Sequence, residues 1–218
     1  MEDAYIYDTV RSPRGRGKKG SLNELTAVAL SAKILKELRE RNSLNTEEIE
    51  DVIWGNVTQV GEQGGCLARS AAIAANYSES TPGLSINRFC ASGLEAVNLA
   101  TNQVKGSAGN GYVAGGVEMM SRVPMGSDGA AIAVDPTLAM NSYFVPQGIS
   151  ADILATKYGF SRDDVDAFAV ESQKRAAAAR QSGHFKKSIA PIKDQNNLTI
   201  LDEDEYIRPE TSMQSLGG

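Results

Sequence analysis

The sequence is poor in the residue types that build disulfide frameworks and metal centres. Its 218 residues include only two cysteines, Cys66 and Cys90, and a single histidine, His184. These cysteines make neither a paired framework nor a metal-ligand spacing, and one histidine excludes a His-rich metal site. We therefore expect no metal site, and we expect a reducing compartment with the cytoplasm as the default.

An excess of positive charge and long apolar runs are also missing. The 22 basic and 27 acidic residues give a net charge of -5, which offers no broad basic field for nucleic acid. The basic stretch at residues 11–19 is short and glycine-rich, and is either a solvated loop or a small polyanion site. No run is apolar over the length of a bilayer, and no signal-peptide pattern is present. We expect neither a nucleic-acid nor a membrane partner.

Short β-type runs alternate with helical ones in the first half of the chain. Strands are predicted at residues 4–10, 51–57, 83–89 and 111–117. Helices are predicted from Ser21, with Glu24 completing a capping box, and at residues 67–76 and 91–105, with a short helical turn at residues 46–50. This alternation is typical of an α/β fold with a mostly parallel, helix-covered sheet.

The pattern changes after residue 120. Residues 121–150 contain several prolines and no sustained period, which predicts a long irregular excursion. A short helix is predicted at residues 150–157, and a longer one is predicted from Ser161, with Asp164 at the capping-box position and Gly183 at its end. Residues 188–207 predict weak strands. One apolar face is expected along the longer helix, at Val165, Phe168, Ala169, Ser172, Ala176 and Ala179.

Cys90 is the residue with the clearest chemical potential. It falls between a predicted strand and a predicted helix, where unsatisfied N–H groups and the helix dipole stabilise a thiolate. From spacing alone, a nucleophile and a buried small hydrophobe are equally good interpretations. Cys66 lacks a base nearby in sequence and is interpreted as structural. His184 follows a helix-ending glycine and is interpreted as a partner of the helix dipole rather than a general base.

A glycine-rich segment, residues 115–120 (GGVEMM), follows the last predicted strand of the first half. It lacks the spacing of a dinucleotide or phosphate-binding fingerprint. Its glycines are expected to allow close backbone packing, and Met119 and Met120 are expected in the core.

These segments together resemble the thiolase family. Residues 87–94 (NRFCASGL) resemble its active-cysteine motif, N-x-x-C-[AS]-S-G, and residues 115–121 (GGVEMMS) resemble its GG-x-E-x-MS segment. Residues 166–176 (DAFAVESQKRA) and 204–209 (DEYIRP) are similar to stretches of its inserted loop domain. The resemblance runs in order along essentially the whole chain, although C-A-S-G alone also fits the related ketosynthases.

The resemblance implies an acyl-CoA acyltransferase. Cys90 would attack the thioester of an acyl-CoA, or the keto carbon of a 3-ketoacyl-CoA, and its backbone N–H would help to hold the oxyanion. CoA is implied as a substrate rather than a bound cofactor, with Arg208 at its adenine end and Ser215 nearby. Residues 146–150 (PQGIS) replace a His-Met-Gly run of short-chain members, which leaves longer acyl groups possible.

The resemblance also implies a domain plan. Residues 1–120 would form the layered core domain without its last strand, and residues 121–218 an α+β loop domain that binds CoA and is truncated at its end. We expect the C-terminal half, with its catalytic histidine, second cysteine and glycine-rich turn, to be absent and this chain alone to be inactive. A homodimer or higher homo-oligomer is expected.

Three other interpretations stay open. The chain could be a ketosynthase of the same fold, a non-catalytic CoA- or acyl-binding module, or an inert assembly fragment. A preference for carrier-linked substrates would favour the first, CoA binding without Cys90 acylation the second, and dimerisation without any ligand response the third.

Overall fold

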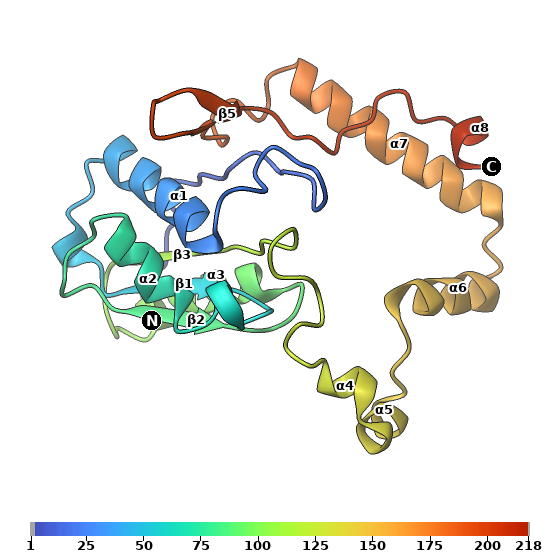
Figure 1. The fold of residues 1–218 in the computed structure, drawn as a ribbon, viewed down its shortest axis with the longest axis horizontal. Helices are drawn as coiled ribbons and strands as arrows, with labels where there is room; N and C mark the ends of the chain where they lie inside the picture. The colour runs from blue at the N-terminus through green and yellow to red at the C-terminus, as the bar shows by residue number, and fades with distance from the viewer. Residues whose placement is uncertain (1–2, 218) are drawn as a thin grey trace. The chain divides into compact units, whose positions relative to one another are not determined.

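The computed structural model describes residues 3–217, and the chain divides into two compact units (Figure 1). The first contains Met1–Asp128 and Ser188–Glu205, and the second contains Gly129–Lys187 and Tyr206–Gly218. The segment Ser188–Glu205 therefore packs with the first unit, although the domain plan from the sequence groups it with residues 121–218.

A three-stranded parallel sheet forms the centre of the first unit. Strand β1 (Asp51–Gly55) lies between β2 (Gly83–Ile86) and β3 (Tyr112–Gly116). The predicted parallel, helix-covered sheet is confirmed, with each of these strands somewhat shorter than the sequence predicts. Because parallel strands all point the same way, the loops that follow β1, β2 and β3 leave the sheet at one edge.

Helices cover both faces of this sheet. Helix α1 (Ala27–Arg41) packs on α2 (Leu67–Ala74), and their apolar side chains share one core cluster with Val52 and Trp54. Helix α3 (Ser92–Lys105) packs on the side of Ile53. Successive residues of a strand point to opposite faces, so β1 is buried on both sides. Two 3-10 turns, η1 (Thr46–Glu48) and η2 (Gly61–Gln63), complete the connections.

The predicted start of the first helix is wrong. Helix α1 begins at Ala27 and is capped by Thr26, whose hydroxyl accepts a hydrogen bond from the Ala29 amide at 3.1 Å. The Ser21 hydroxyl instead donates to the Glu205 carboxylate at 2.6 Å. A partner 184 residues away in sequence therefore replaces the local capping box.

The predicted strand at residues 4–10 is also wrong. Its side chains are largely exposed, with Tyr5, Ile6 and Tyr7 among the exposed apolar residues, and no β-ladder includes it in the described chain. Favourable β-propensity does not make a strand without a partner, because strand stability comes from pairing and half-burial. The first ordered pairing along the chain is the bridge between Arg11 and Ile189.

The segment Ser188–Glu205 carries β4 (Ile192–Lys193) and β5 (Thr199–Leu201), which pair antiparallel. Ile192 is fully buried in the main core cluster. Two carboxylates tie the end of this segment to the basic loop. Asp204 pairs with Arg11 at 2.7 Å, and Glu205 accepts from the amides of Arg16 and Ser21. We call these contacts the Asp204–Glu205 clasp.

The second unit consists of helices. It contains α4 (Ala131–Val134), α5 (Pro136–Ser142), α6 (Gln147–Tyr158), α7 (Arg162–Gln181) and α8 (Met213–Leu216). The irregular segment predicted at residues 121–150 thus contains two short helices and the start of a third. The capping box of Ser161 and Asp164 is confirmed. Among residues 3–217, no helix has both the length and the apolar character needed to cross a bilayer.

The apolar face predicted for α7 is not the face that is buried. Phe168 is 79% exposed and Val165 is 46% exposed, whereas Asp166, Val170 and Ala177 are buried. The Asp166–Ala177 side also carries Gln173, whose side chain accepts the backbone N–H of Arg208 at 2.7 Å. The segment after residue 205 therefore runs along this side of α7. This tertiary contact, and not the apolar stripe, decides which face of the helix is buried.

Candidate active site

Cys90 lies in the short turn that joins β2 to α3, at the edge of the sheet where all three parallel strands end. Its side chain is exposed and its thiol is free. Strand β2 ends at Ile86 and α3 begins at Ser92, so the thiol belongs to the residues that immediately precede the helix. Unsatisfied N–H groups of a first helical turn favour negative charge at such a position.

The backbone just before Cys90 is held in an unusual conformation. Phe89 has a φ of 48°, in the left-handed region that a bulky residue rarely adopts. The Asn87 side chain accepts the Phe89 N–H at 2.8 Å. The buried Ser92 hydroxyl donates to the Phe89 carbonyl at 2.6 Å and accepts the Arg88 N–H at 2.9 Å. Side chains on both sides of Cys90 therefore define the turn.

Glycines let neighbouring backbones approach this turn closely. A Cβ on Gly55 would lie 2.5 Å from the Ser92 carbonyl carbon, so the end of β1 packs directly under the start of α3. A Cβ on Gly116 would lie 2.7 Å from the Gly55 carbonyl oxygen, and one on Gly115 would lie 2.6 Å from the Trp54 ring. The predicted role of the 115–116 glycines in close packing is confirmed. Met119 is buried as expected, whereas Met120 is exposed and not in the core.

Glu118 forms a polar network that the sequence did not reveal. Its carboxylate accepts hydrogen bonds from the Val57 and Thr58 amides at 2.8 and 3.3 Å. It also accepts from the side chains of Asn56 and Gln63 at 3.2 and 2.8 Å. These donors follow β1, whereas Glu118 follows β3, so the network joins two loops at the same edge of the sheet as Cys90. No motif spacing signals it, because the partners are 55 to 62 residues away.

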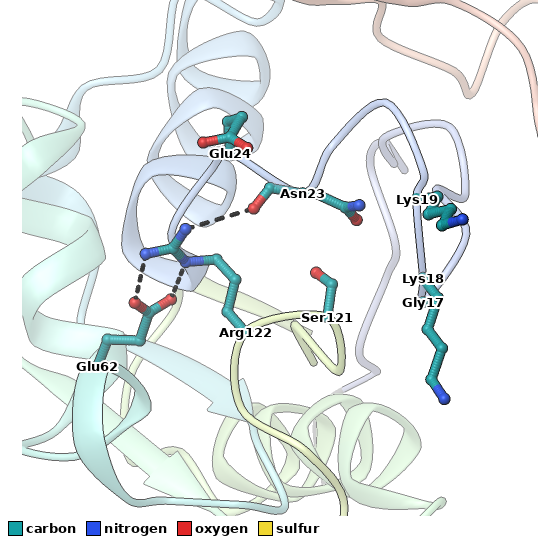
Figure 2. Close-up of a pocket in the computed structure, with 8 residues that line it drawn as sticks. All are labelled: Gly17, Lys18, Lys19, Asn23, Glu24, Glu62, Ser121 and Arg122. Carbon is teal, nitrogen blue, oxygen red and sulfur yellow. Dashed lines mark hydrogen bonds and ion pairs between the residues drawn. The ribbon is translucent and has the colours of Figure 1, made fainter.

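An open depression of about 550 Å³ lies near the same loops (Figure 2). Its principal interaction is between Arg122 and Glu62, joined by two hydrogen bonds of 2.7 and 2.9 Å. These bonds lower the pKa of Glu62 below its usual range. Arg122 also donates to the Asn23 carbonyl at 3.3 Å. The remaining lining residues are Gly17, Lys18, Lys19, Glu24 and Ser121.

Two basic residues of this depression and of the neighbouring basic loop form ion pairs with acids of the same chain. Arg122 is paired with Glu62, and Arg11 of the 11–19 stretch is paired with Asp204. Glu24 adds a further acid to the lining. An ion pair is thus shown for one of the five basic residues of the 11–19 stretch, and both interpretations of that stretch stay open.

The two other residues considered from the sequence have separate surroundings. Cys66 precedes α2 with a left-handed φ of 57°, and its thiol donates to the Gly83 carbonyl at 3.2 Å. Cys66 is exposed rather than buried. His184 lies in the second unit, where its backbone N–H donates to the Ala179 carbonyl at the end of α7.

Comparison with known proteins identifies the family. The sequence-family model of the thiolase N-terminal domain matches residues 4–218. The chain belongs to the thiolase family. It is 37% identical over 222 residues to a 3-ketoacyl-CoA thiolase of Colwellia psychrerythraea, covering 99% of this chain and 57% of that protein. A 3-ketoacyl-CoA thiolase of Shewanella sp. (strain MR-7) is 40% identical with the same coverage. The chain thus spans little more than half the length of these thiolases.

The thiolase resemblance predicts CoA contacts at Arg208 and Ser215, and both lie in the second unit. Arg208 is exposed, and its carbonyl accepts the Thr211 hydroxyl at 2.8 Å. The Ser215 hydroxyl accepts the Ser212 N–H at 3.0 Å in the capping box of α8. Arg208 therefore presents a guanidinium at the surface, whereas the Ser215 hydroxyl already takes part in the cap of α8.

Proposed function

We propose that this chain is the nucleophile-bearing part of an acyl-CoA acyltransferase in which Cys90 carries the acyl group. The observation that carries the proposal is the placement of a free, exposed thiol between β2 and the first turn of α3. Membership of the thiolase family supports it, and so does the similarity to 3-ketoacyl-CoA thiolases.

The chemistry follows from a thiolate at this position. The Cys90 sulfur would attack the carbonyl carbon of an acyl-CoA thioester, forming a new thioester as the bond to the CoA sulfur breaks. With a 3-ketoacyl-CoA, attack at the keto carbon would break the adjacent carbon–carbon bond, and the departing acetyl-CoA carbanion would take up a proton. In either direction a backbone N–H at Cys90 would stabilise the oxyanion.

A nucleophile alone does not make an efficient catalyst. Among residues 3–217, no side chain hydrogen-bonds the Cys90 thiol. The acyl transfer proposed above needs a group that removes and returns protons. We therefore expect these residues by themselves to accept an acyl group slowly and to show little or no turnover, because removing members of a cooperating set removes most of the rate.

CoA is the proposed partner of the second unit. The guanidinium of Arg208 is exposed and can stack on or hydrogen-bond an adenine nucleotide. Ser215 would add a hydroxyl whose oxygen also serves the α8 cap. In this proposal residues 1–120 are the core domain and residues 121–218 the CoA-binding loop domain, and both free thiols suit a reducing, cytoplasmic setting.

A homodimer or higher homo-oligomer is proposed because the two outer strands of the sheet each have an unpaired side. Within the described residues, β2 and β3 each pair on one side only. The unpaired side of an outer strand can pair with a further strand, so a second copy of the chain could cover β2 or β3. Light scattering on a size-exclusion column should give at least twice the mass of the 23.2 kDa chain, and a clean monomer would contradict this part of the proposal.

The test is acylation followed by intact and peptide mass spectrometry. The chain is incubated with a medium-chain acyl-CoA, and the expected result is one acyl group, mapped to Cys90 and absent in Cys90→Ser. Cys66→Ser is the matched control and should be acylated like the parent. CoA binding without any acylation would overturn the proposal in favour of a binding module, and acylation only from acyl carrier protein would favour a ketosynthase.

A further inference from the structure

We propose that Glu118 is a positioning residue for Cys90, acting through the Val57 peptide and the Asn87 side chain. The inference rests on the proposed function, since it gives Glu118 a task only if Cys90 is the nucleophile. Glu118 itself does not touch the thiol. Its effect would come from fixing the turn on which the thiol sits.

The route from Glu118 to the turn consists of three hydrogen bonds. The Val57 N–H donates to Glu118 at 2.8 Å. The Val57 carbonyl accepts the Asn87 side-chain amide at 3.1 Å. The oxygen of the same Asn87 side chain accepts the Phe89 N–H at 2.8 Å. Asn87 thus connects the loop after β1 to the peptide that precedes the nucleophile.

The route ends on the one strained residue of the turn. Phe89 adopts a φ of 48°, and a side chain in that region raises the energy of the backbone. Such a conformation persists only where its surroundings hold it. If the Asn87 side chain were free to rotate, the Phe89 peptide could relax, and Cys90 would move relative to the first turn of α3. Moved away from the first turn of α3, the Cys90 sulfur would lose the nearby N–H groups that favour its thiolate, and it would react more slowly.

The network around Glu118 requires a carboxylate. It receives two backbone N–H groups and two side-chain amides, so all four partners are donors. A glutamine at this position would turn an NH₂ group toward other donors and leave part of the network unpaired. Buried polar networks tolerate such mismatches poorly.

Asn56 shows that the network is organised around the charge of Glu118. Asn56 is fully buried, and its NH₂ group donates to Glu118 and to the Val117 carbonyl, both at 3.2 Å. Its own side-chain oxygen is buried without a hydrogen-bond partner in the described chain. The opposite orientation of the amide would place that oxygen against two acceptors, so the orientation that serves Glu118 is kept although it leaves an acceptor unpaired.

The experiment measures how fast iodoacetamide alkylates Cys90 in the 218-residue chain and in three variants: Glu118→Gln, Asn87→Asp and the double variant. Asn87→Asp keeps an oxygen that can accept the Phe89 N–H, replaces the donor to Val57 by a second acceptor, and adds a negative charge to the turn. We expect each single variant to slow Cys90 about tenfold, the loss typical of one removed hydrogen-bonded support.

The double variant decides whether the two residues act on one route. If they do, it should react no more slowly than the slower single variant. Effects that multiply would overturn the proposal, and so would an unchanged Cys90 rate in Glu118→Gln. If Glu118→Gln does not fold by circular dichroism, Asn87→Asp carries the test alone, because it leaves all four bonds to Glu118 in place. An unchanged rate there would overturn the proposal equally.

Two controls separate positioning from general loosening. Glu62→Gln weakens the pair with Arg122, which joins the loops after β1 and β3 but has no bond to Asn87, and should leave the Cys90 rate unchanged. Cys66, whose thiol donates to the Gly83 carbonyl, is the internal reference and should react at the same rate in all variants. Alkylation needs no acyl-CoA. A chain that shows this coupling but is never acylated would therefore contradict the proposed function and not the positioning role.

Discussion

Each of the two compact units of this chain is stabilised in a different way. The first has a buried sheet with helices on both faces, and Leu35, Val52, Ile53 and Leu67 are fully enclosed. In the second, only Asp166, Val170 and Ala177 are buried among the described residues. Helix α6 has no buried residue at all. The first unit is thus ordered by apolar burial, and the second by capping and side-chain hydrogen bonds.

This difference matches the tasks proposed for the two units. A nucleophile must be held in one geometry, and Cys90 stands on the unit whose core fixes the strands and helices around it. A surface that contacts a long, flexible substrate such as CoA can gain order on binding. Arg208 lies on the unit with the smaller core, in a segment attached to α7 through Gln173.

The largest expected effect on stability comes from shortening a leucine to alanine, compared between one position in each unit. Leu35 is 0% exposed and Leu154 is 51% exposed. Leu35→Ala should destabilise the chain by about 2–5 kcal/mol, because it leaves a cavity in a packed core. Leu154→Ala should change stability by no more than about 0.5 kcal/mol. Urea unfolding followed by the fluorescence of the single tryptophan, Trp54 in β1, measures the first unit, and far-UV circular dichroism, which includes the helices of both units, measures both changes. Equal losses would mean that the contrast between the units does not govern stability.

A smaller effect should be confined to the second unit. The Ser161 hydroxyl accepts the Asp164 N–H at 3.2 Å and starts the 20-residue helix α7. Ser161→Ala should destabilise this helix by about 1 kcal/mol, the usual value of an N-cap. Hydrogen exchange should then speed up in α7 and not in α1–α3. Ser182→Ala is the control, since Ser182 caps the other end through its backbone N–H. Faster exchange in the sheet helices would show that the units unfold together.

Most of the first unit could be predicted from its sequence because its signals are local. Alternating strand and helix patterns gave β1 to β3, α2 and α3 in the right order. The failures came where a distant group decided the outcome. Ser21 has the spacing of a helix cap but binds Glu205, and residues 4–10 have β-forming side chains but no strand beside them. Phe168 lies on a clear apolar stripe yet is exposed, because the 206–217 segment takes the other side of α7.

The site was predictable only in part, for the same reason. Cys90 could be singled out because a cysteine between a strand and a helix has a recognisable chemistry. Glu118 lies in the segment that resembles GG-x-E-x-MS, but its hydrogen-bond network could not be predicted, because its four partners lie in another loop. Local sequence thus singled out the proposed nucleophile, whereas the groups proposed to position it became visible only in the tertiary structure.

The smallest expected effect concerns pH and the Asp204–Glu205 clasp of the first unit. The hydrogen-bonded guanidinium of Arg11 lowers the pKa of Asp204, and the hydroxyl of Ser21 lowers the pKa of Glu205. A carboxyl whose pKa is lower in the folded chain contributes stability above its unfolded pKa of about 4. That contribution is lost as the pH falls through the lowered value. The clasp should therefore hold at neutral pH and open only in acid.

Amide hydrogen exchange, expressed as protection relative to the unfolded chain, can detect this opening. The amides of Arg14, Arg16 and Ser21 donate to the two carboxylates, so their protection should fall as the pH drops below about 4. The Ala29 amide donates to the Thr26 hydroxyl, which does not titrate, and should keep its protection. Glu205→Gln should lower the protection of Arg16 and Ser21 already at neutral pH and remove its pH dependence. A loss shared equally by Ala29 would mean that the whole unit opens in acid, and that the clasp is no more sensitive than the core it borders.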